Sequence, residues 1–378
     1  MYLTIQEGYA THLPYKKILY VANDYDNLSI IKNALLINNS LHGGIRDFGL
    51  NLLKQFGNVG SSLEYYEIIP NWKGLFGTFI RVIKSRKTII YNLGFTSFGN
   101  SYLRNFMHFV FVGILSMLGY DFRIILHDSP EIMEKDATIQ SLNKIVIYGS
   151  RIVMLLLKNT RIYVVSVRMN SLLKNKYNHN NTSYYPFPCD LTVERYEDKG
   201  GPLAVFTVGH ILPYKGYDML IPIKKILPQL EIICIGDKSP SLQNEKKYNI
   251  YFEKLKGDLI NSGLKLTGYL DMKQIQKLLS SYRSIGLLPY SSMSGSSASA
   301  IFFVERGIPI ISSKLDEFQR LHELGAGVWL AERNAAGFVH IIKYLSNDTS
   351  IFRKTRIKDS KYCEKYNYLG LLEALISE

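Results

Sequence analysis

The sequence predicts an α/β protein made of two successive, doubly wound parallel halves. The chain of 378 residues is long enough for two domains of ordinary size. Short apolar runs alternate with segments of helical length, which is typical of parallel sheets covered on both faces. A polar stretch at 194–201, ending in Gly-Gly-Pro, interrupts the alternation, which then starts again. We therefore expect a first domain over 1–198, a second over 199–351, and a C-terminal helix in 352–378 that packs back on the first domain.

In the first half, the run at 16–21 predicts the first strand, and the asparagine-rich segment after it predicts a loop. A helix is expected to open at His42-Gly43-Gly44, because Phe48, Leu52 and Phe56 then recur at helical spacing. The remaining apolar runs predict strands at 88–93, 122–126, 162–166, 203–208, 231–235, 264–267, 284–288 and 308–312. Near the C-terminus, one helical face is predicted to carry Tyr368, Leu371, Leu372 and Leu375.

The composition limits the partners and the location of the protein. A net charge of +13 favours polyanionic partners such as phosphates or anionic lipids, and no nucleic-acid-binding motif is present. Three scattered cysteines indicate a reducing compartment, and the N-terminus shows no signal peptide. The most apolar stretch, 106–118, is too short to span a bilayer and predicts a buried or interfacial helix. We expect a cytoplasmic protein, with peripheral attachment to the inner face of the cell membrane as a further expectation.

Glycines and a lysine mark two candidate phosphate-binding loops. Ligands of open parallel sheets bind beyond the carboxyl ends of the strands, where loops enter helices. Gly43 and Gly44 would let backbone amides approach a ligand, although an ordinary glycine-rich turn explains them equally well. After the strand at 203–208, Gly209 and His210 lead to Lys215, which can place an ammonium group on a diphosphate. A solvated surface lysine is the alternative.

A run of small residues follows the strand at 284–288 and forms a third candidate loop. It contains Ser294, Gly295, Ser296 and Ser297, and small hydroxyl residues at a helix start leave the amides open for phosphate. A capped helix packed on a neighbour is the alternative. A fourth candidate is His127, at the end of the strand at 122–126, where a structural role is equally compatible. No G-x-G-x-x-G or P-loop is present.

Together these loops resemble the retaining GT-B glycosyltransferases, in particular the large family 4-like group of mannosyl-, glucosyl- and N-acetylglucosaminyltransferases. The segment 208–218 resembles the family's G-R-x-x-x-x-K-G-x-D motif, with His210 in the arginine position. The segments 235–237, 287–291 and 307–311 resemble its V-G-D, L-x-P-S and G-x-P-V-I motifs, and Gly268-Tyr269 resembles the strand end near which these enzymes hold the nucleobase. His42-Gly43-Gly44 resembles the donor-side glycine loop, and His127 lies where the family has its active-site histidine.

The resemblance fails at one motif. The family has two glutamates eight positions apart that hold sugar and ribose hydroxyls. Counting back from Gly307 places Phe302 and Ser294 at these positions. The nearest carboxylate, Glu305, is three residues beyond Phe302. It is expected either to pair with a neighbouring cation or to reach the donor from a shifted helix.

The resemblance implies a two-domain fold with the active site in the cleft between the domains. The implied activity is transfer of a hexose from a UDP- or GDP-linked sugar to a glycan, lipid-linked or polysaccharide acceptor, with retention of configuration. Lys215, His210 and His127 are then the catalytic candidates. The donor would lie among Gly43, Gly44, Gly209, Lys215, Gly268, Tyr269, Ser294, Gly295, Ser296, Ser297 and Glu305.

The resemblance implies no metal and no further cofactor, and Asp24-Tyr25-Asp26 is expected to be a solvated loop. Two other functions stay open. The absent glutamates are compatible with a non-catalytic homologue that acts as a donor-binding or partner subunit. A GT-B epimerase or phosphorylase is the other alternative. The basic first half, with Arg81, Lys84, Arg86 and Lys87 close together, adds an anionic membrane surface to the expected partners.

Overall fold

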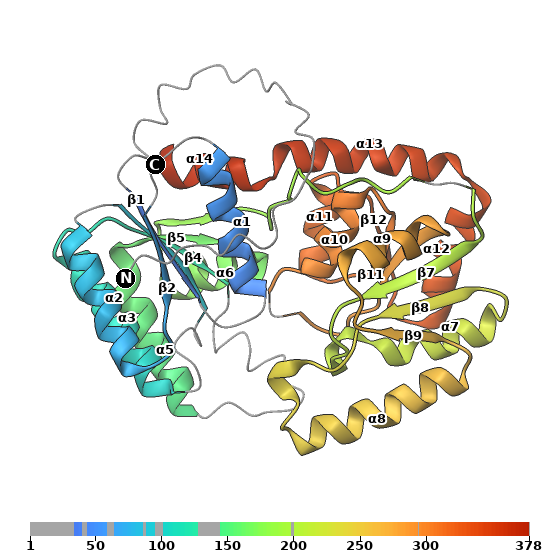
Figure 1. Cartoon of the computed structure of the whole chain (residues 1–378), viewed down its shortest axis with the longest axis horizontal. Coiled ribbons are helices and arrows are strands. Elements are labelled where there is room, and N and C mark those ends of the chain that lie inside the picture. The colour runs from blue at the N-terminus through green and yellow to red at the C-terminus, as the bar shows by residue number, and fades with distance from the viewer. Residues whose placement is uncertain are drawn as a thin grey trace.

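The computed structural model describes residues 34–39, 44–58, 64–85, 88–94, 101–127, 144–197, 200–293 and 295–377. Its core is a pair of six-stranded sheets in which all the strand pairings are parallel (Figure 1). The first sheet has the strand order β2 (Glu64–Ile68), β1 (Ala34–Asn39), β3 (Thr88–Leu93), β4 (Phe122–Leu126), β5 (Arg161–Val164) and β6 (Thr182–Tyr184). The second has the order β12 (Val328–Ala331), β11 (Ile310–Ser313), β10 (Arg283–Leu288), β7 (Leu203–Val208), β8 (Glu231–Ile235) and β9 (Lys265–Gly268).

Helices cover both faces of the first sheet. Alternate residues of β1 enter two different cores, because successive side chains of a strand point to opposite faces. Leu35 and Ile37 face one core, whereas Ala34 and Leu36 face the other. The first core is closed by α2 (Trp72–Ser85), α3 (Tyr102–Met117) and α5 (Lys144–Leu156). The second is closed by α1 (Gly44–Asn58) and α14 (Tyr368–Ser377).

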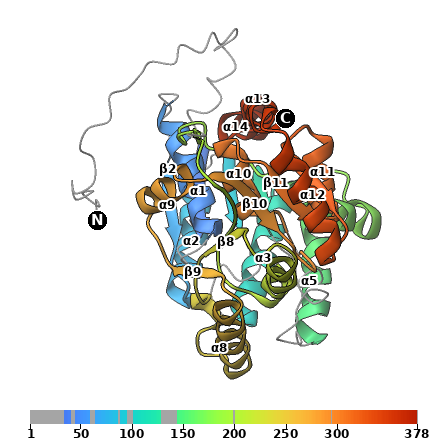
Figure 2. The same ribbon diagram turned by 90° about the vertical axis from the view of Figure 1, so that its right-hand side faces the viewer.

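The second sheet is covered in the same way. One of its cores lies under α7 (Leu220–Ile226), α8 (Lys246–Asn261) and α12 (Ala335–Asn347). The other lies under α9 (Met272–Ser280), α10 (Ala298–Arg306), α11 (Asp316–Glu323) and α13 (Ser350–Lys365). The chain therefore folds into two α/β units that stand side by side in Figure 1, and in Figure 2 the second unit lies in front of the first.

The last two helices cross from the second unit to the first. α13 packs against α10, and Tyr362 and Cys363 enter the core of the second unit. α14 then lies on the first sheet, where Tyr368, Leu371, Leu372 and Leu375 are at most 3% exposed. The Tyr163 hydroxyl donates to the Ala374 carbonyl at 3.0 Å, so a strand of the first sheet also holds this helix. Because α13 packs on the second unit and α14 on the first, the C-terminal segment links the two units.

Several strands inside the sheets have the bounds that the sequence predicts, whereas several edge strands were not predicted. The strands expected at 88–93, 122–126, 203–208 and 231–235 have the observed bounds. The asparagine-rich segment predicted as a loop contains β1, because burial between two helical layers outweighs the low strand propensity of asparagine. β2, β6 and β12 were not predicted, and the strand expected at 16–21 lies outside the described residues. In the described part of the chain, no helix combines the length and apolarity that crossing a membrane requires.

We predict that Leu372→Ala destabilises the first unit, because Leu372 is fully buried between α14 and the sheet. The loss of a buried leucine side chain costs about 2–5 kcal/mol. Urea unfolding measures this change. Leu155→Ala, at a position that is 60% exposed, is the control and should shift the midpoint little. Equal effects of the two substitutions would contradict the packing of α14.

Candidate functional site

The loop after β7 holds a lysine against a glycine. Gly209 has φ 111°, in the region that favours glycine. A Cβ at this position would lie 2.8 Å from Lys215 Nζ and 3.2 Å from Ser299 Oγ. Ser299 in turn donates to the Val208 carbonyl at 2.8 Å and so fixes α10 at the end of β7. Glycine at 209 therefore leaves the space in which the lysine ammonium lies.

Lys215 is half-buried and has no carboxylate partner within the described residues. Its Nζ lies 5.7 Å from the centroid of the Tyr290 ring, in a cation–π arrangement. The turn around it is fixed from the other side: Ser291 N donates to the Tyr214 carbonyl at 2.7 Å. A positive charge held in place without a counter-ion is suited to an anionic ligand.

His210 lies beside this lysine, at an exposed position. Burial of its ring and the charge of Lys215 lower its pKa, and a hydrogen bond with the Lys238 backbone opposes them. A pKa below 6.5 leaves the ring neutral at pH 7. His210 therefore does not supply the positive charge of the arginine that occupies this place in the resembling family. A neutral imidazole can still donate one hydrogen bond.

The loop of small residues that contains Ser296 and Ser297, which we call the small-residue loop, leads into α10 at the carboxyl ends of the strands of the second sheet. Ser297 is the N-cap of this helix: its side chain accepts a hydrogen bond from Ala300 N at 3.1 Å. This capping role was the alternative to phosphate binding. It takes up Ala300 N and leaves the amides of Ala298 and Ser299 in the first turn of α10 without helical partners. Ser294 lies outside the described residues, and a Cβ at Gly295 would lie 3.4 Å from the His127 carbonyl. The loop of the second unit therefore lies close to the end of β4 in the first unit.

His127 belongs to a polar network at the carboxyl edge of the first sheet. Its Nε2 lies 2.6 Å from Asn92 Oδ1. Asn92 Nδ2 donates to Asn38 Oδ1 at 2.8 Å and to the Ile45 carbonyl at 2.7 Å, which fixes its oxygen as the acceptor. Nε2 of His127 therefore carries the proton and Nδ1 is an acceptor. Burial lowers the pKa of His127 to about 4, so the ring is neutral at pH 7.

Asn38 and Asn92 were not identified from the sequence. They end two neighbouring strands, β1 and β3, and both are fully buried. In the sequence, each is an asparagine next to the last residue of its strand, and propensity does not distinguish such a residue from a loop asparagine. The ring of His127 also packs edge-on against Phe48 of α1 at 4.7 Å. The histidine is thus held in a single orientation from two sides.

A buried carboxylate joins the two units beside the small-residue loop. Glu317 of α11 accepts hydrogen bonds from the Ser166 hydroxyl and from Val167 N, both at 2.6 Å. These groups form the start of α6 (Val167–Ser171), which follows β5. Arg168 Nη1 donates to the Met293 carbonyl at 2.5 Å. Glu317 and Arg168 therefore fix the second unit's loop against the first unit.

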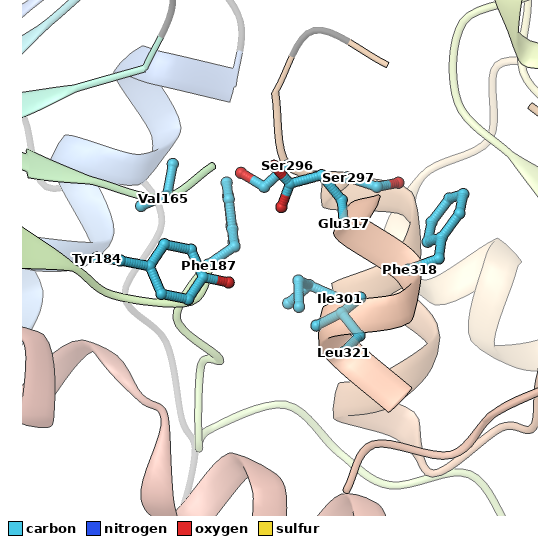
Figure 3. Close-up of a pocket in the computed structure, with 9 residues that line it drawn as sticks. All are labelled: Val165, Tyr184, Phe187, Ser296, Ser297, Ile301, Glu317, Phe318 and Leu321. Atoms are coloured by element: carbon cyan, nitrogen blue, oxygen red, sulfur yellow. The ribbon is translucent and has the colours of Figure 1, made fainter. Parts of the chain in front are cut away.

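The space between the units at this point is a small pocket (Figure 3). Its enclosed part has room for little more than a water molecule. Side chains of both units surround it: Val165, Tyr184, Phe187, Ser296, Ser297, Ile301, Glu317, Phe318 and Leu321. Ser296 and Ser297 thus face the first unit (Figure 3).

Glu305 lies away from the loops after β7 and β10, which are the candidates for donor binding. It is seven residues beyond the start of α10, which corresponds to about 10 Å along the helix. Its Oε1 accepts from Asp190 N at 2.7 Å, and its Oε2 lies 3.7 Å from Arg306 Nη1. Of the two expectations for this residue, the contacts match pairing with a neighbouring cation. Phe302, in place of the second family glutamate, packs with its ring centroid 3.8 Å from the Arg306 guanidinium carbon.

The remaining candidates lie at other strand ends. Gly268, with φ 70°, ends β9 and accepts from Gly236 N at 3.0 Å, so the ends of β8 and β9 are joined. Tyr269 is 83% exposed and has its ring available to stack on a planar ligand. Gly44 begins α1, whereas Gly43 lies outside the described residues, as do Asp128 and Asp24-Tyr25-Asp26. Gly209, His210, Lys215, Gly268 and Ser297 all lie at the carboxyl ends of strands in one sheet.

The comparisons with known proteins identify the fold. Neither the protein-family models nor the curated proteins include a match. Among solved structures, HepE from Anabaena in complex with UDP and glucose has a TM-score of 0.64 at 13% identity, covering 91% of this chain and 98% of that one. Sucrose-phosphate synthase from Thermosynechococcus elongatus has a TM-score of 0.66 at 13% identity, covering 91% and 96%. A glycosyltransferase from Rickettsia africae has a TM-score of 0.64 at 11% identity, covering 91% and 96%. The chain therefore has the two-domain GT-B fold of these proteins.

We predict that Glu305→Gln leaves donor binding intact and changes the pH dependence of stability. Burial raises the pKa of Glu305 to about 7 from 4.5. Between these pH values the unfolded chain releases the proton that the folded chain retains, so wild-type stability falls as the pH rises. The variant lacks this loss, and its melting temperature relative to wild type should rise from pH 5 to pH 8. Glu323→Gln, at an exposed ion pair, is the control.

The opposite pattern would place Glu305 in the site. Calorimetry with UDP measures donor affinity for the wild type and both variants. If Glu305→Gln abolishes UDP binding while its melting temperature follows that of the wild type, the carboxylate contacts the donor and the structural role is wrong.

Proposed function

We propose that this protein is a glycosyltransferase that moves a hexose from a nucleotide-diphosphate sugar to a glycan, lipid-linked or polysaccharide acceptor. The observation that carries the proposal is the half-buried Lys215 ammonium, which lies at the end of β7 beside Gly209 without a carboxylate partner in the described residues. The first amides of α10 lie at the end of the adjacent strand β10. An ammonium group and a helix N-terminus that meet at one sheet edge suit a diphosphate.

The proposed reaction breaks the bond between the sugar and the diphosphate. Negative charge grows on the departing nucleoside diphosphate, and fixed positive groups that meet this charge lower the barrier. Lys215 would supply a full charge, and the α10 amides would supply partial charges and hydrogen bonds. His210, being neutral, would add at most one hydrogen bond. We propose a step without a metal, as the family resemblance implies, in which these groups meet the charge of the diphosphate.

His127 is proposed to face the sugar from the other unit. Its Nδ1 is an acceptor without a partner among the described residues, since Nε2 is bonded to Asn92. A neutral acceptor there can hold a sugar hydroxyl, and its fixed ring orientation avoids an ordering cost when the donor binds. We propose retention of configuration from the family resemblance, which requires no protein nucleophile.

The nucleotide and the acceptor belong to the same proposal. HepE is complexed with UDP and with UDP-glucose in its structures, so UDP is the first nucleotide to test here, with GDP as the alternative. The exposed Tyr269 ring at the end of β9 offers a surface on which a nucleobase can stack. We propose a cytoplasmic location with peripheral association at the inner face of the membrane, where a lipid-linked acceptor would be reached.

A non-catalytic donor-binding subunit is the second candidate function. It is favoured by one observation: Phe302 takes the place of a sugar-binding carboxylate, and Glu305 is occupied by Asp190 N and Arg306. A wild-type protein that binds UDP, yet neither hydrolyses nor transfers any of a broad panel of nucleotide sugars, would establish this function. A GT-B epimerase would instead interconvert the sugar of the nucleotide without an acceptor.

We predict that Lys215→Ala weakens UDP binding by roughly 10- to 150-fold, since the loss of one charge-assisted hydrogen bond costs on the order of 1.5–3 kcal/mol. Isothermal titration calorimetry measures the affinity. Lys254→Ala, at an exposed position of α8 outside these loops, is the matched control and should bind as the wild type does. Unchanged affinity in Lys215→Ala would remove this lysine from the site and with it the observation on which the proposal depends.

A further inference from the structure

The outer surface of the α2, α3 and α5 layer is unusually apolar for a protein surface. Of the 18 large hydrophobic side chains that are exposed in the described residues, 11 lie on or directly beside these three helices. They are Ile69, Trp72, Phe76, Ile80, Ile83, Leu103, Ile114, Met117, Leu118, Ile152 and Leu155. We call this surface the apolar face. Scattered exposed hydrophobic residues are normal, but a concentration on one layer marks an interaction site.

The apolar face is continuous along α2. Trp72, Phe76, Ile80 and Ile83 recur at spacings of four, four and three residues. At 100° per residue they share an arc of about 80° on the helix surface. The residues that α2 buries in the core, Gly74, Leu75, Thr78, Phe79 and Val82, lie outside this arc, in a separate sector that adjoins it beside Trp72. The helix therefore presents a second apolar stripe, which the described part of the chain does not cover.

Positive charge borders this stripe. Lys73, Arg81 and Lys84 are exposed, and on the helix they lie on one side of it. α2, α3 and α5 together contain six Lys or Arg and no Asp or Glu. Arg81 forms an ion pair with Glu64 of β2, whereas Lys73 and Lys84 have no carboxylate partner among the described residues. A surface that combines aliphatic and aromatic side chains with such lysines matches the interface of an anionic lipid bilayer.

The charge also argues against a second copy of the chain as the occupant. A symmetric dimer through this face would bring the exposed Lys73 and Lys84 of two copies together without a compensating carboxylate from the three helices. The position of the apolar face relative to the candidate site is also compatible with a lipid surface. Ile69 and Trp72 directly follow β2, so one end of the stripe lies at the carboxyl edge of the sheet, the edge that His127 also occupies.

We infer that the apolar face of the first unit docks on an anionic membrane surface, with Trp72, Phe76, Ile80 and Ile83 entering the interfacial region and Lys73 and Lys84 contacting lipid phosphates. Through this surface the protein would approach a lipid-linked acceptor, so the use of the surface rests on the proposed function. It centres the expected contact on α2, which contains Lys84 of the 81–87 basic run. Of the 106–118 segment, Ile114, Met117 and Leu118 belong to the apolar face. Phe109, Val112 and Leu115 of that segment are buried in the core.

Vesicle co-sedimentation of the full chain tests the inference. We expect binding to vesicles of phosphatidylcholine with phosphatidylglycerol, much weaker binding to phosphatidylcholine alone, and a loss of binding as salt rises. The triple variant Phe76→Gln/Ile80→Gln/Ile83→Gln should bind anionic vesicles at least tenfold more weakly. Lys73→Glu/Lys84→Glu should show the same loss. The control Ile250→Gln/Ile260→Gln, at exposed positions of α8, should bind as the wild type does.

Two results would overturn the inference. One is the absence of vesicle binding at any salt concentration. The other is vesicle binding that the α2 variants retain as fully as the control does. Melting temperatures of all variants show whether the fold is intact, since every substituted residue is exposed. UDP affinity is measured in the same preparations: it should be unchanged in the α2 variants, so a failure of membrane docking and a failure of the donor site are distinguishable.

Discussion

The contact between Glu317 and the start of α6 is the interaction on which the arrangement of the site depends. Burial of a carboxylate costs several kcal/mol unless hydrogen bonds replace its water. Here the Ser166 hydroxyl and Val167 N provide them, from the opposite unit. The cost of leaving Glu317 unpaired therefore opposes separation of the units. Arg168 adds a direct bond to the Met293 carbonyl, so the loop that enters α10 keeps its place beside His127.

A second constraint comes from the connections between the units. The two segments that cross between them pair with each other: Cys189 N donates to the Tyr366 carbonyl at 3.0 Å, and Tyr368 N donates to the Cys189 carbonyl at 3.4 Å. Asp190 is bonded through its amide to Glu305 of α10. Glu305 thus holds the crossing segments to the second unit. This contact accounts for a buried carboxylate in α10 that lies away from the loops after β7 and β10.

Much of the fold could be predicted from the sequence, because buried parallel strands are continuous apolar runs. β3, β4, β7 and β8 are of this kind. β1 escaped prediction because Asn38 and Asn39 end it, and an amide buried in a network cannot be told from a loop asparagine by propensity. β2 is a half-buried edge strand with two glutamates, which lacks an apolar run.

The candidate site was predictable residue by residue only in part. Strand-end position identified Gly209, Lys215 and His127, because topology alone brings these ends to one cleft. Contacts across the cleft had no sequence signal: Glu317 and Arg168 meet partners more than 120 residues away. The state of His210 depends on its burial and on the nearby Lys215 charge, which no spacing reveals.

We propose that the diphosphate of a nucleotide binds between Lys215 and the start of α10. A crystal structure of the wild-type chain with UDP tests it most directly. We expect diphosphate density within hydrogen-bond distance of Lys215 Nζ and of the first α10 amides, with the uridine ring toward Tyr269. Density for UDP at another place, or an empty cleft at saturating UDP, would contradict it.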